Sequence, residues 1–131
     1  MIIDSSAIVA IIRAESDAAD FGSAISQARS PRMSAGTLVE CAIVVDSARE
    51  PVVSGRLDEL LAEHRIQIEP VTARQAEIAR RAYRDFGRGS GSPANLNFGD
   101  CFAYALAKDL REPLLYKGDD FAHTDIRSAL D

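Results

Sequence analysis

The chain has 131 residues, which is enough for one domain with a buried core and too few for two domains of ordinary size. It has no apolar run of the roughly 20 residues that a membrane-spanning helix needs, and its start, MIIDSSAIVAII, lacks the basic leader of a signal peptide. The net charge of −5 argues against a protein that coats nucleic acid through bulk electrostatics. We therefore expect a cytoplasmic protein with a single domain over residues 1–131.

Several common kinds of site are excluded by the motifs that the chain lacks. Cys41 and Cys101 show neither CxxC nor Cys/His spacing, so we expect buried reduced thiols and no zinc. His64 and His123 stand alone and are expected at the surface. The chain has no Walker loop and no GxGxxG motif, which makes a nucleotide cofactor improbable.

Apolar runs and helical patterns alternate along almost the whole chain. Short strands are predicted at residues 1–4, 31–34, 66–70 and 113–117. Helices are predicted at residues 5–15, 17–30, 35–48, 51–65, 72–87 and 98–110. Ser16 is expected to cap the second helix, Pro51 to lie in the first turn of the fourth, and Thr72 with Gln75 to form a capping box.

This alternation predicts an α/β fold in which helices cover both faces of a parallel sheet. A Gly/Ser-rich loop, GRGSGSPANLN, separates the last two helices and contains Leu96 as its one expected core residue. Open sheets of this kind bind their ligands outside the carboxyl ends of the strands.

Four acidic residues fall at that edge of the predicted sheet. Asp4 ends the first strand, and Asp119 follows the last. Glu40 and Asp100 lie in the first turns of the third and the last helix. Taken singly, an acid near a helix N-terminus is explained by the helix dipole. Together, the four side chains can converge in one cleft.

The apolar neighbours of these acids indicate that they face the interior. Glu40 stands between TLV and CAIVV, and Asp100 stands between NF and CFAYALA. Carboxylates gathered in a partly buried cleft take up protons unless a cation holds them together. Oxygen ligands without His or Cys favour Mg²⁺ or Mn²⁺. The residues therefore predict a metal-dependent hydrolase of phosphodiesters that uses a metal-activated water.

In order and context these motifs resemble the PIN-domain ribonucleases and, among them, the VapC toxins of toxin-antitoxin pairs. The resemblance spans the chain and is carried by IIDSSAIVAI, TLVE, LNFGDCFAYALA and LLYKGDDFAHTDI. It implies a PIN-like three-layer α/β/α sandwich with a short, mostly parallel central sheet. It also implies RNA cleavage with Mg²⁺ or Mn²⁺, a homodimer, and inhibition by a VapB-like antitoxin.

Carried over by position, the resemblance implies that Asp4, Glu40, Asp100 and Asp119 form the catalytic metal site. Ser6 looks like the small hydroxyl residue that supports the first aspartate. The register at GDDF leaves a choice between Asp119 and Asp120. We favour Asp119 because it comes first after the strand, and we expect Asp120 to point away. Asp125, in HTDI, is expected to be structural.

Two surfaces are candidates for partners. Arg80, Arg81, Arg84 and Arg88 could contact RNA phosphates or could simply form a solvated helix face. The helices that contain AIVAII and LDELLAEH are expected to expose apolar side chains to an amphipathic antitoxin helix, whose arginine would reach the acidic residues. The alternative is that these faces complete the core or a homodimer contact.

Two other functions compete with the nuclease. A response-regulator receiver is also a short α/β domain that holds Mg²⁺ with acids, and Lys117 could imitate its lysine after the final strand. A receiver, however, has paired acids at the end of the first strand, where this chain continues from Asp4 into serines. The third possibility is a non-catalytic binding module whose acids are only helix caps.

Overall fold

Four parallel strands of two or three residues form the centre of the computed structural model, which describes residues 1–131. Their order across the sheet is β3-β2-β1-β4. β1 pairs with β2 at Ile2 and Arg32, and with β4 through Ile2–Leu114 and Ile3–Leu115. The strands are β1 (Ile2–Ile3), β2 (Arg32–Ser34), β3 (Gln67–Glu69) and β4 (Leu114–Leu115).

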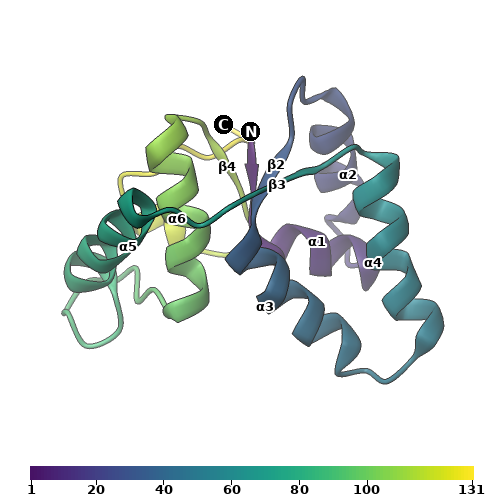
Figure 1. Cartoon of the computed structure of the whole chain (residues 1–131), viewed down its shortest axis with the longest axis horizontal. Helices are drawn as coiled ribbons and strands as arrows, with labels where there is room; N and C mark the ends of the chain where they lie inside the picture. Colours follow the sequence, from purple (N-terminus) through teal and green to yellow (C-terminus); the bar gives the residue numbers. More distant parts are fainter.

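Six α-helices cover the two faces of this sheet and complete the predicted three-layer sandwich. In Figure 1, α5 and α6 lie on one side of the strands, and α1 to α4 lie on the other. No helix is long and apolar enough to cross a membrane. The helices are α1 (Ser5–Ile12), α2 (Ala18–Gln27), α3 (Ala35–Asp46), α4 (Pro51–Glu63), α5 (Ala73–Phe86) and α6 (Phe98–Leu110), followed by a 3-10 turn, η1 (Phe121–His123).

Two hydrophobic cores lie on opposite faces of the sheet, because successive strand residues point to opposite sides. Ile3 and Leu115 belong to the core under α1 to α4. Ile2 and Leu114 belong to the core under α5 and α6. Each of the two-residue strands β1 and β4 therefore contributes to both cores. This accounts for the continuous apolar character of these two strands.

The helix starts follow the sequence in most cases. The Thr72 hydroxyl accepts a hydrogen bond from the Gln75 backbone amide at 3.1 Å, but the Gln75 side chain donates to Asp109 instead, so only half of the predicted capping box forms. Pro51 lies in the first turn of α4 as predicted. Ser16 does not cap α2, since Asp17 occupies the N-cap position and its side chain makes no capping bond. The Asp17 carboxylate instead accepts a hydrogen bond from the Lys117 ammonium at 3.1 Å.

The expectation that α1 and α4 expose an apolar groove is wrong. Ala7, Ile8, Ala10 and Ile12 of α1 are buried, as are Leu57 and Leu60 of α4. These side chains fill the core that α1 to α4 share, which was the alternative interpretation. Of the large hydrophobic side chains that are exposed, Val52 is on α4. The others lie on other elements, at Val39, Ile43, Ile68, Val71, Tyr83, Phe98 and Leu130.

Candidate active site

Asp4 lies at the end of β1 and caps the first turn of α1. Its Oδ2 accepts hydrogen bonds from the Ser6 backbone amide at 3.1 Å and from the Ser6 hydroxyl at 2.7 Å. The side chain is 2% exposed, and its other oxygen, Oδ1, is buried without a hydrogen-bond partner. Burial raises the pKa of Asp4 to about 6, against the opposing effect of the Ser6 hydrogen bonds. Ser6 thus supports the first aspartate as predicted.

Glu40 reaches the same place from the second turn of α3. Its Oε1 accepts a hydrogen bond from the Ser5 hydroxyl at 2.7 Å, which fixes the carboxylate beside the start of α1. The carboxylate also lies so close to Gly99 that a Cβ atom at that position would overlap it. A glycine therefore lets Glu40 approach the first turn of α6.

Asp100 lies in that first turn of α6. It forms a capping box with Asn97: Asp100 Oδ2 accepts from the Asn97 amide at 3.0 Å, and Asn97 Oδ1 accepts from the Asp100 amide at 2.9 Å. Burial raises the pKa of Asp100 to about 6, and the charges of Asp4, Asp120 and Glu40 raise it further. Asp4, Glu40 and Asp100 therefore act on one another electrostatically, although they come from three elements.

The fourth acidic residue stays a choice between two neighbours. Asp119 and Asp120 both lie exposed in the loop between β4 and η1. The charge of Asp120 is among the causes that raise the pKa of Asp100, so Asp120 lies within electrostatic reach of that carboxyl group. This supports Asp120 as a candidate for the fourth acid beside Asp119, which the sequence favours.

Asp125 has the structural role that was predicted for it. Its Oδ1 accepts a hydrogen bond from the Tyr104 hydroxyl at 2.6 Å, and its Oδ2 accepts from the Lys108 ammonium at 2.8 Å. Both donors belong to α6. Asp125 thus ties the C-terminal segment to that helix, and its oxygens are already engaged.

The two cysteines next to the acidic residues are buried and unpaired, as expected. Burial raises the pKa of Cys41 to about 12, and the charges of Asp4 and Glu40 contribute to the shift. Burial likewise raises the pKa of Cys101 to about 11, with a contribution from Asp100. Both thiols stay protonated near neutral pH in the metal-free protein, so neither is a thiolate nucleophile there.

The acidic residues do not form a finished metal cage. No group of three or more His, Cys, Asp or Glu side chains is arranged so that it could hold a metal ion. The donor set nevertheless suits a hard cation, because it consists of carboxylates and includes a buried oxygen of Asp4 that has no partner. We refer to Asp4, Glu40, Asp100 and Asp120 as the acidic centre.

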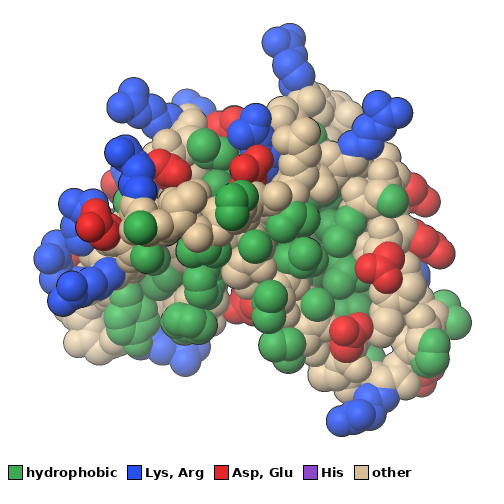
Figure 2. All heavy atoms as spheres, in the orientation of Figure 1, with side chains coloured by type: hydrophobic (Ala, Val, Ile, Leu, Met, Phe, Trp, Pro, Cys, Tyr) green, Lys and Arg blue, Asp and Glu red, His purple; other side chains and the backbone are tan.

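Beside the acidic centre, the surface is apolar. A hollow of about 450 Å³ is lined by Glu40 and Gly99 together with Val39, Ile43 and Phe98. Phe98 is 77% exposed and packs edge-on against Phe102, with ring centroids 5.0 Å apart. Figure 2 shows hydrophobic side chains between the two halves of the molecule on this face.

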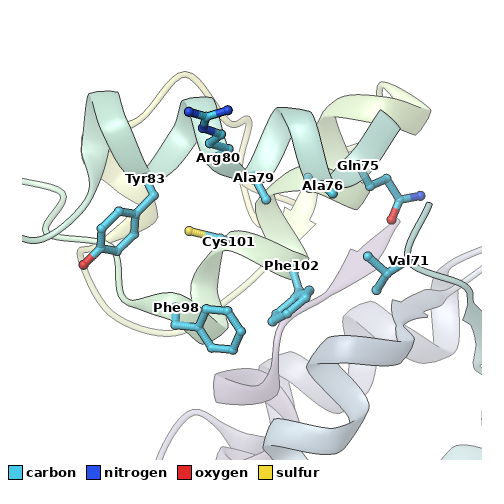
Figure 3. Close-up of a pocket in the computed structure, with 10 residues that line it drawn as sticks. Val71, Gln75, Ala76, Ala79, Arg80, Tyr83, Phe98, Cys101 and Phe102 are labelled. Atoms are coloured by element: carbon cyan, nitrogen blue, oxygen red, sulfur yellow. The ribbon is translucent and has the colours of Figure 1, made fainter. Parts of the chain in front are cut away.

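A second pocket, of about 370 Å³, adjoins this hollow between α5 and α6. In Figure 3, Phe98 and Phe102 lie along one side and Tyr83, Ala79 and Ala76 along the other. Arg80 stands at its rim. Arg80, Arg81, Arg84 and Arg88 are all exposed, so α5 carries a basic face next to an apolar one.

Comparison with known proteins identifies the family. The PIN domain family matches residues 1–127. Ribonuclease VapC28 of Mycobacterium tuberculosis is 60% identical over 131 residues, which is all of this chain and 98% of that protein. Ribonuclease VapC42 of the same species is 50% identical over 129 residues, with 98% of each chain covered.

A solved structure agrees on the fold. The crystal structure of Mycobacterium tuberculosis VapC20, described as a Sarcin-Ricin loop cleaving toxin, superposes with a TM-score of 0.74. The match covers 95% of both chains at 15% sequence identity, so it bears on the fold alone. On the strength of the family match and the full-length relatives, this chain belongs to the PIN domain family and, within it, to the VapC ribonucleases.

Proposed function

We propose that this protein is a toxic Mg²⁺- or Mn²⁺-dependent endoribonuclease that hydrolyses RNA phosphodiesters with a metal-activated water. The observation that carries the proposal is the buried, unpartnered Oδ1 of Asp4 in a group of carboxylates, where burial and neighbouring negative charges raise the pKa of Asp4 and of Asp100. Such a group is poorly stabilised by the protein alone. A divalent cation would satisfy both the free oxygen and the excess of negative charge.

Asp4, Glu40 and Asp100 are the residues that we propose hold the cation, and the fourth acid is Asp120 or Asp119. The absence of a ready cage of three ligands is compatible with Mg²⁺, which is usually held by one or two carboxylates and keeps several waters. When bound, the cation would neutralise charge on a phosphate oxygen and lower the pKa of its water.

The chain's own residues prepare this chemistry. Ser6 fixes the orientation of Asp4, so that Oδ2 is occupied and Oδ1 stays free for a ligand. Ser5 holds Glu40 toward α6, and the capping box holds Asp100 at the start of that helix. The RNA itself would be bound by arginines on α5, since their exposed side chains offer charge and hydrogen bonds to phosphates.

Cleavage assays test the proposal directly. Purified protein should cleave total RNA with Mg²⁺ or Mn²⁺, and EDTA should stop the reaction. The products should carry 5′-phosphates if a water attacks phosphorus. A 2′,3′-cyclic phosphate would show that the ribose hydroxyl attacks instead, and a lack of any cleavage would favour the non-catalytic binding module. Membership of the PIN domain family already decides against a receiver domain.

We also propose that the protein acts in the cytoplasm as one domain and pairs with a VapB-like antitoxin. Since α1 and α4 bury most of their apolar side chains, we expect an antitoxin helix to use other surfaces than the sequence suggested. An arginine of that partner could still reach the acidic centre and bind its carboxylates. Expression should be toxic, Asp4→Asn should abolish toxicity, and the small protein encoded beside this one should restore growth through a stable complex.

A homodimer is the further assembly that we propose. The exposed Val39, Ile43 and Phe98, together with the two hollows that Phe98 lines, form an exposed apolar face, and exposed apolar patches often mark contacts between proteins. A second copy of the chain would bury this face. The face borders Glu40 and Gly99, so the dimer contact would lie beside the acidic centre.

A further inference from the structure

The loop between β4 and η1 carries Asp119 and Asp120, and one residue holds it at two points. The Lys117 backbone amide donates a hydrogen bond to the Ser6 hydroxyl at 2.9 Å. The Lys117 ammonium, at the other end of the same residue, bonds to Glu15 at 3.3 Å and to Asp17 at 3.1 Å. Lys117 thus joins this loop to both ends of the α1 segment.

The first of these bonds leads directly to the acidic centre. Ser6 Oγ accepts from the Lys117 amide and donates to Asp4 Oδ2, so the hydroxyl is shared between the loop and the buried aspartate. A displacement of Lys117 would therefore change the support of Asp4 as well as the position of the loop. Sequence reasoning assigned Ser6 to Asp4 alone and missed this second bond.

The bonds of the Lys117 ammonium are unusual because one of them uses the Asp17 carboxylate, which could otherwise cap α2. Asp17 occupies the N-cap position of α2, yet its side chain makes no capping bond and binds Lys117 instead. Ion pairs between exposed side chains contribute little to stability, and the Lys117 side chain is 36% exposed. A gain in folding stability is thus a weak explanation for the two ion pairs of Lys117. Their effect on the position of the loop explains them better.

The residue after Lys117 explains why the loop needs such an anchor. Gly118 has φ of +99°, a conformation that glycine adopts freely and other residues rarely adopt. Because glycine allows many backbone conformations, the turn at Gly118 does not by itself fix the direction of the loop. On the far side of the turn, the buried Phe121 fixes η1 against Tyr116, with ring centroids 5.2 Å apart. The two acids thus lie between an anchored lysine and an anchored phenylalanine.

We propose that Lys117 is a positioning residue of the acidic centre, which holds the loop through Glu15 and Asp17 so that Asp120 and Asp4 keep their places. The predicted effect on cation binding rests on the proposed metal site, whereas the predicted effect on the position of the loop does not. Lys117 acts through the loop and through Ser6. It needs no contact with RNA or with the cation.

The test compares Lys117→Met with Lys117→Arg and with a control, Arg74→Met. Arg74 on α5 also pairs with a carboxylate, Asp109 on α6 at 2.8 Å, and neither residue borders the loop in the chain. In the metal-free protein, amide exchange of residues 118–124 should be faster in Lys117→Met, near normal in Lys117→Arg and unchanged in Arg74→Met. Unchanged exchange in Lys117→Met would overturn the proposal whether or not the protein binds metal.

The functional consequence is measured separately, as Mn²⁺ affinity without RNA. Loss of a residue that orients metal ligands typically weakens affinity by about 10- to 100-fold, and we expect about tenfold for Lys117→Met. A triple variant, Lys117→Glu with Glu15→Lys and Asp17→Lys, should recover part of the loss. If Lys117→Met bound Mn²⁺ with the affinity of the unmodified protein, Lys117 would only form surface ion pairs and would not position the acidic centre. If the unmodified protein bound no Mn²⁺, the proposed metal dependence would fail, and the exchange result would still decide the positioning role.

Discussion

Ser5 Oγ and Glu40 Oε1 lie 2.7 Å apart, and this hydrogen bond joins the first turn of α1 to the second turn of α3. The bond matters because it is the hydrogen bond that holds the Glu40 carboxylate in place. Without it, the carboxylate would be free to rotate into the adjoining hollow that it lines with Val39 and Ile43.

We therefore predict that Ser5→Ala lowers RNA cleavage by about tenfold, in the range found when residues that orient metal ligands are removed. The fold should be retained, since the hydroxyl is only partly buried. Ser23→Ala is the matched control, because its hydroxyl makes an exposed bond to Gln27 on α2. Equal rates of RNA cleavage for Ser5→Ala and Ser23→Ala would show that Glu40 does not need the hydrogen bond from Ser5.

Asp4→Asn and Asp100→Asn should each abolish cleavage while the fold survives. Each change removes one charge from the acidic centre and keeps the side-chain volume. Circular dichroism would verify the fold, and Asp58→Asn, an exposed carboxylate on α4, is the control that should cleave normally. Near-normal cleavage by either site variant, with the same metal, would remove that residue from the ligand set.

The metal-free protein should become less stable as the pH rises from about 4 to about 7. The pKa of Asp4 is raised from 3.8 to about 6 in the folded state, so between these values the folded state binds more protons than the unfolded state. Stability then falls with rising pH, and the ionised Asp4 costs about 3 kcal/mol at neutral pH.

Thermal unfolding in EDTA across this pH range measures the effect. Asp4→Asn should make the profile less steep and raise the melting temperature at pH 7, because its side chain cannot ionise. Asp100, whose pKa is also raised to about 6, should keep part of the pH dependence. Added Mn²⁺ should stabilise the unmodified protein most at pH 7, where the carboxylates are charged. A profile for the unmodified protein that rises over this range would contradict the assignment.

Asp119→Asn and Asp120→Asn separate the two candidates for the fourth acid. Because the charge of Asp120 acts on Asp100, Asp120→Asn should lower the pKa of Asp100 and weaken Mn²⁺ binding more than Asp119→Asn does. The pKa can be followed by NMR of the Asp100 carboxyl carbon in metal-free protein. The opposite order would support Asp119, which the sequence favours.

Phe98→Ser should convert a dimer to a monomer, as measured by light scattering. Phe98 and Val52 are equally exposed, at 77%, so Val52→Ser on α4 is a control of matched exposure outside the two hollows. If both variants kept the mass of the unmodified protein, the apolar face beside the acidic centre would not be the contact between copies.

The sequence predicted the fold well because its short apolar runs and helical patterns are local signals. The strand segments, the helix that starts after Asp4, and the positions of Glu40 and Asp100 in their helices all follow from periodicity and capping. The parallel sheet followed from the alternation of the two element types, and it placed the acids at one edge.

The errors concern contacts between distant segments. Ser5 and Lys117 carry no motif, and their partners lie 35 and 100 or more residues away. The sequence leaves the choice between Asp119 and Asp120 open because Gly118 turns the chain after β4, and strand alternation no longer tells which way a side chain points. The sequence suggests an exposed apolar face on α1 and α4 because composition does not show how many helices share one core.

The placement of the two cores gives the acidic centre one more property. Glu40 belongs to a helix that packs in the core with Ile3, and Asp100 to a helix that packs in the core with Ile2. A ligand that binds both carboxylates would therefore span the interface between two independently packed layers. A cavity in the core of one layer, as made by Leu106→Ala, should therefore weaken cation binding although it changes no carboxylate. Cation affinity would then report on how tightly the two layers pack against the sheet.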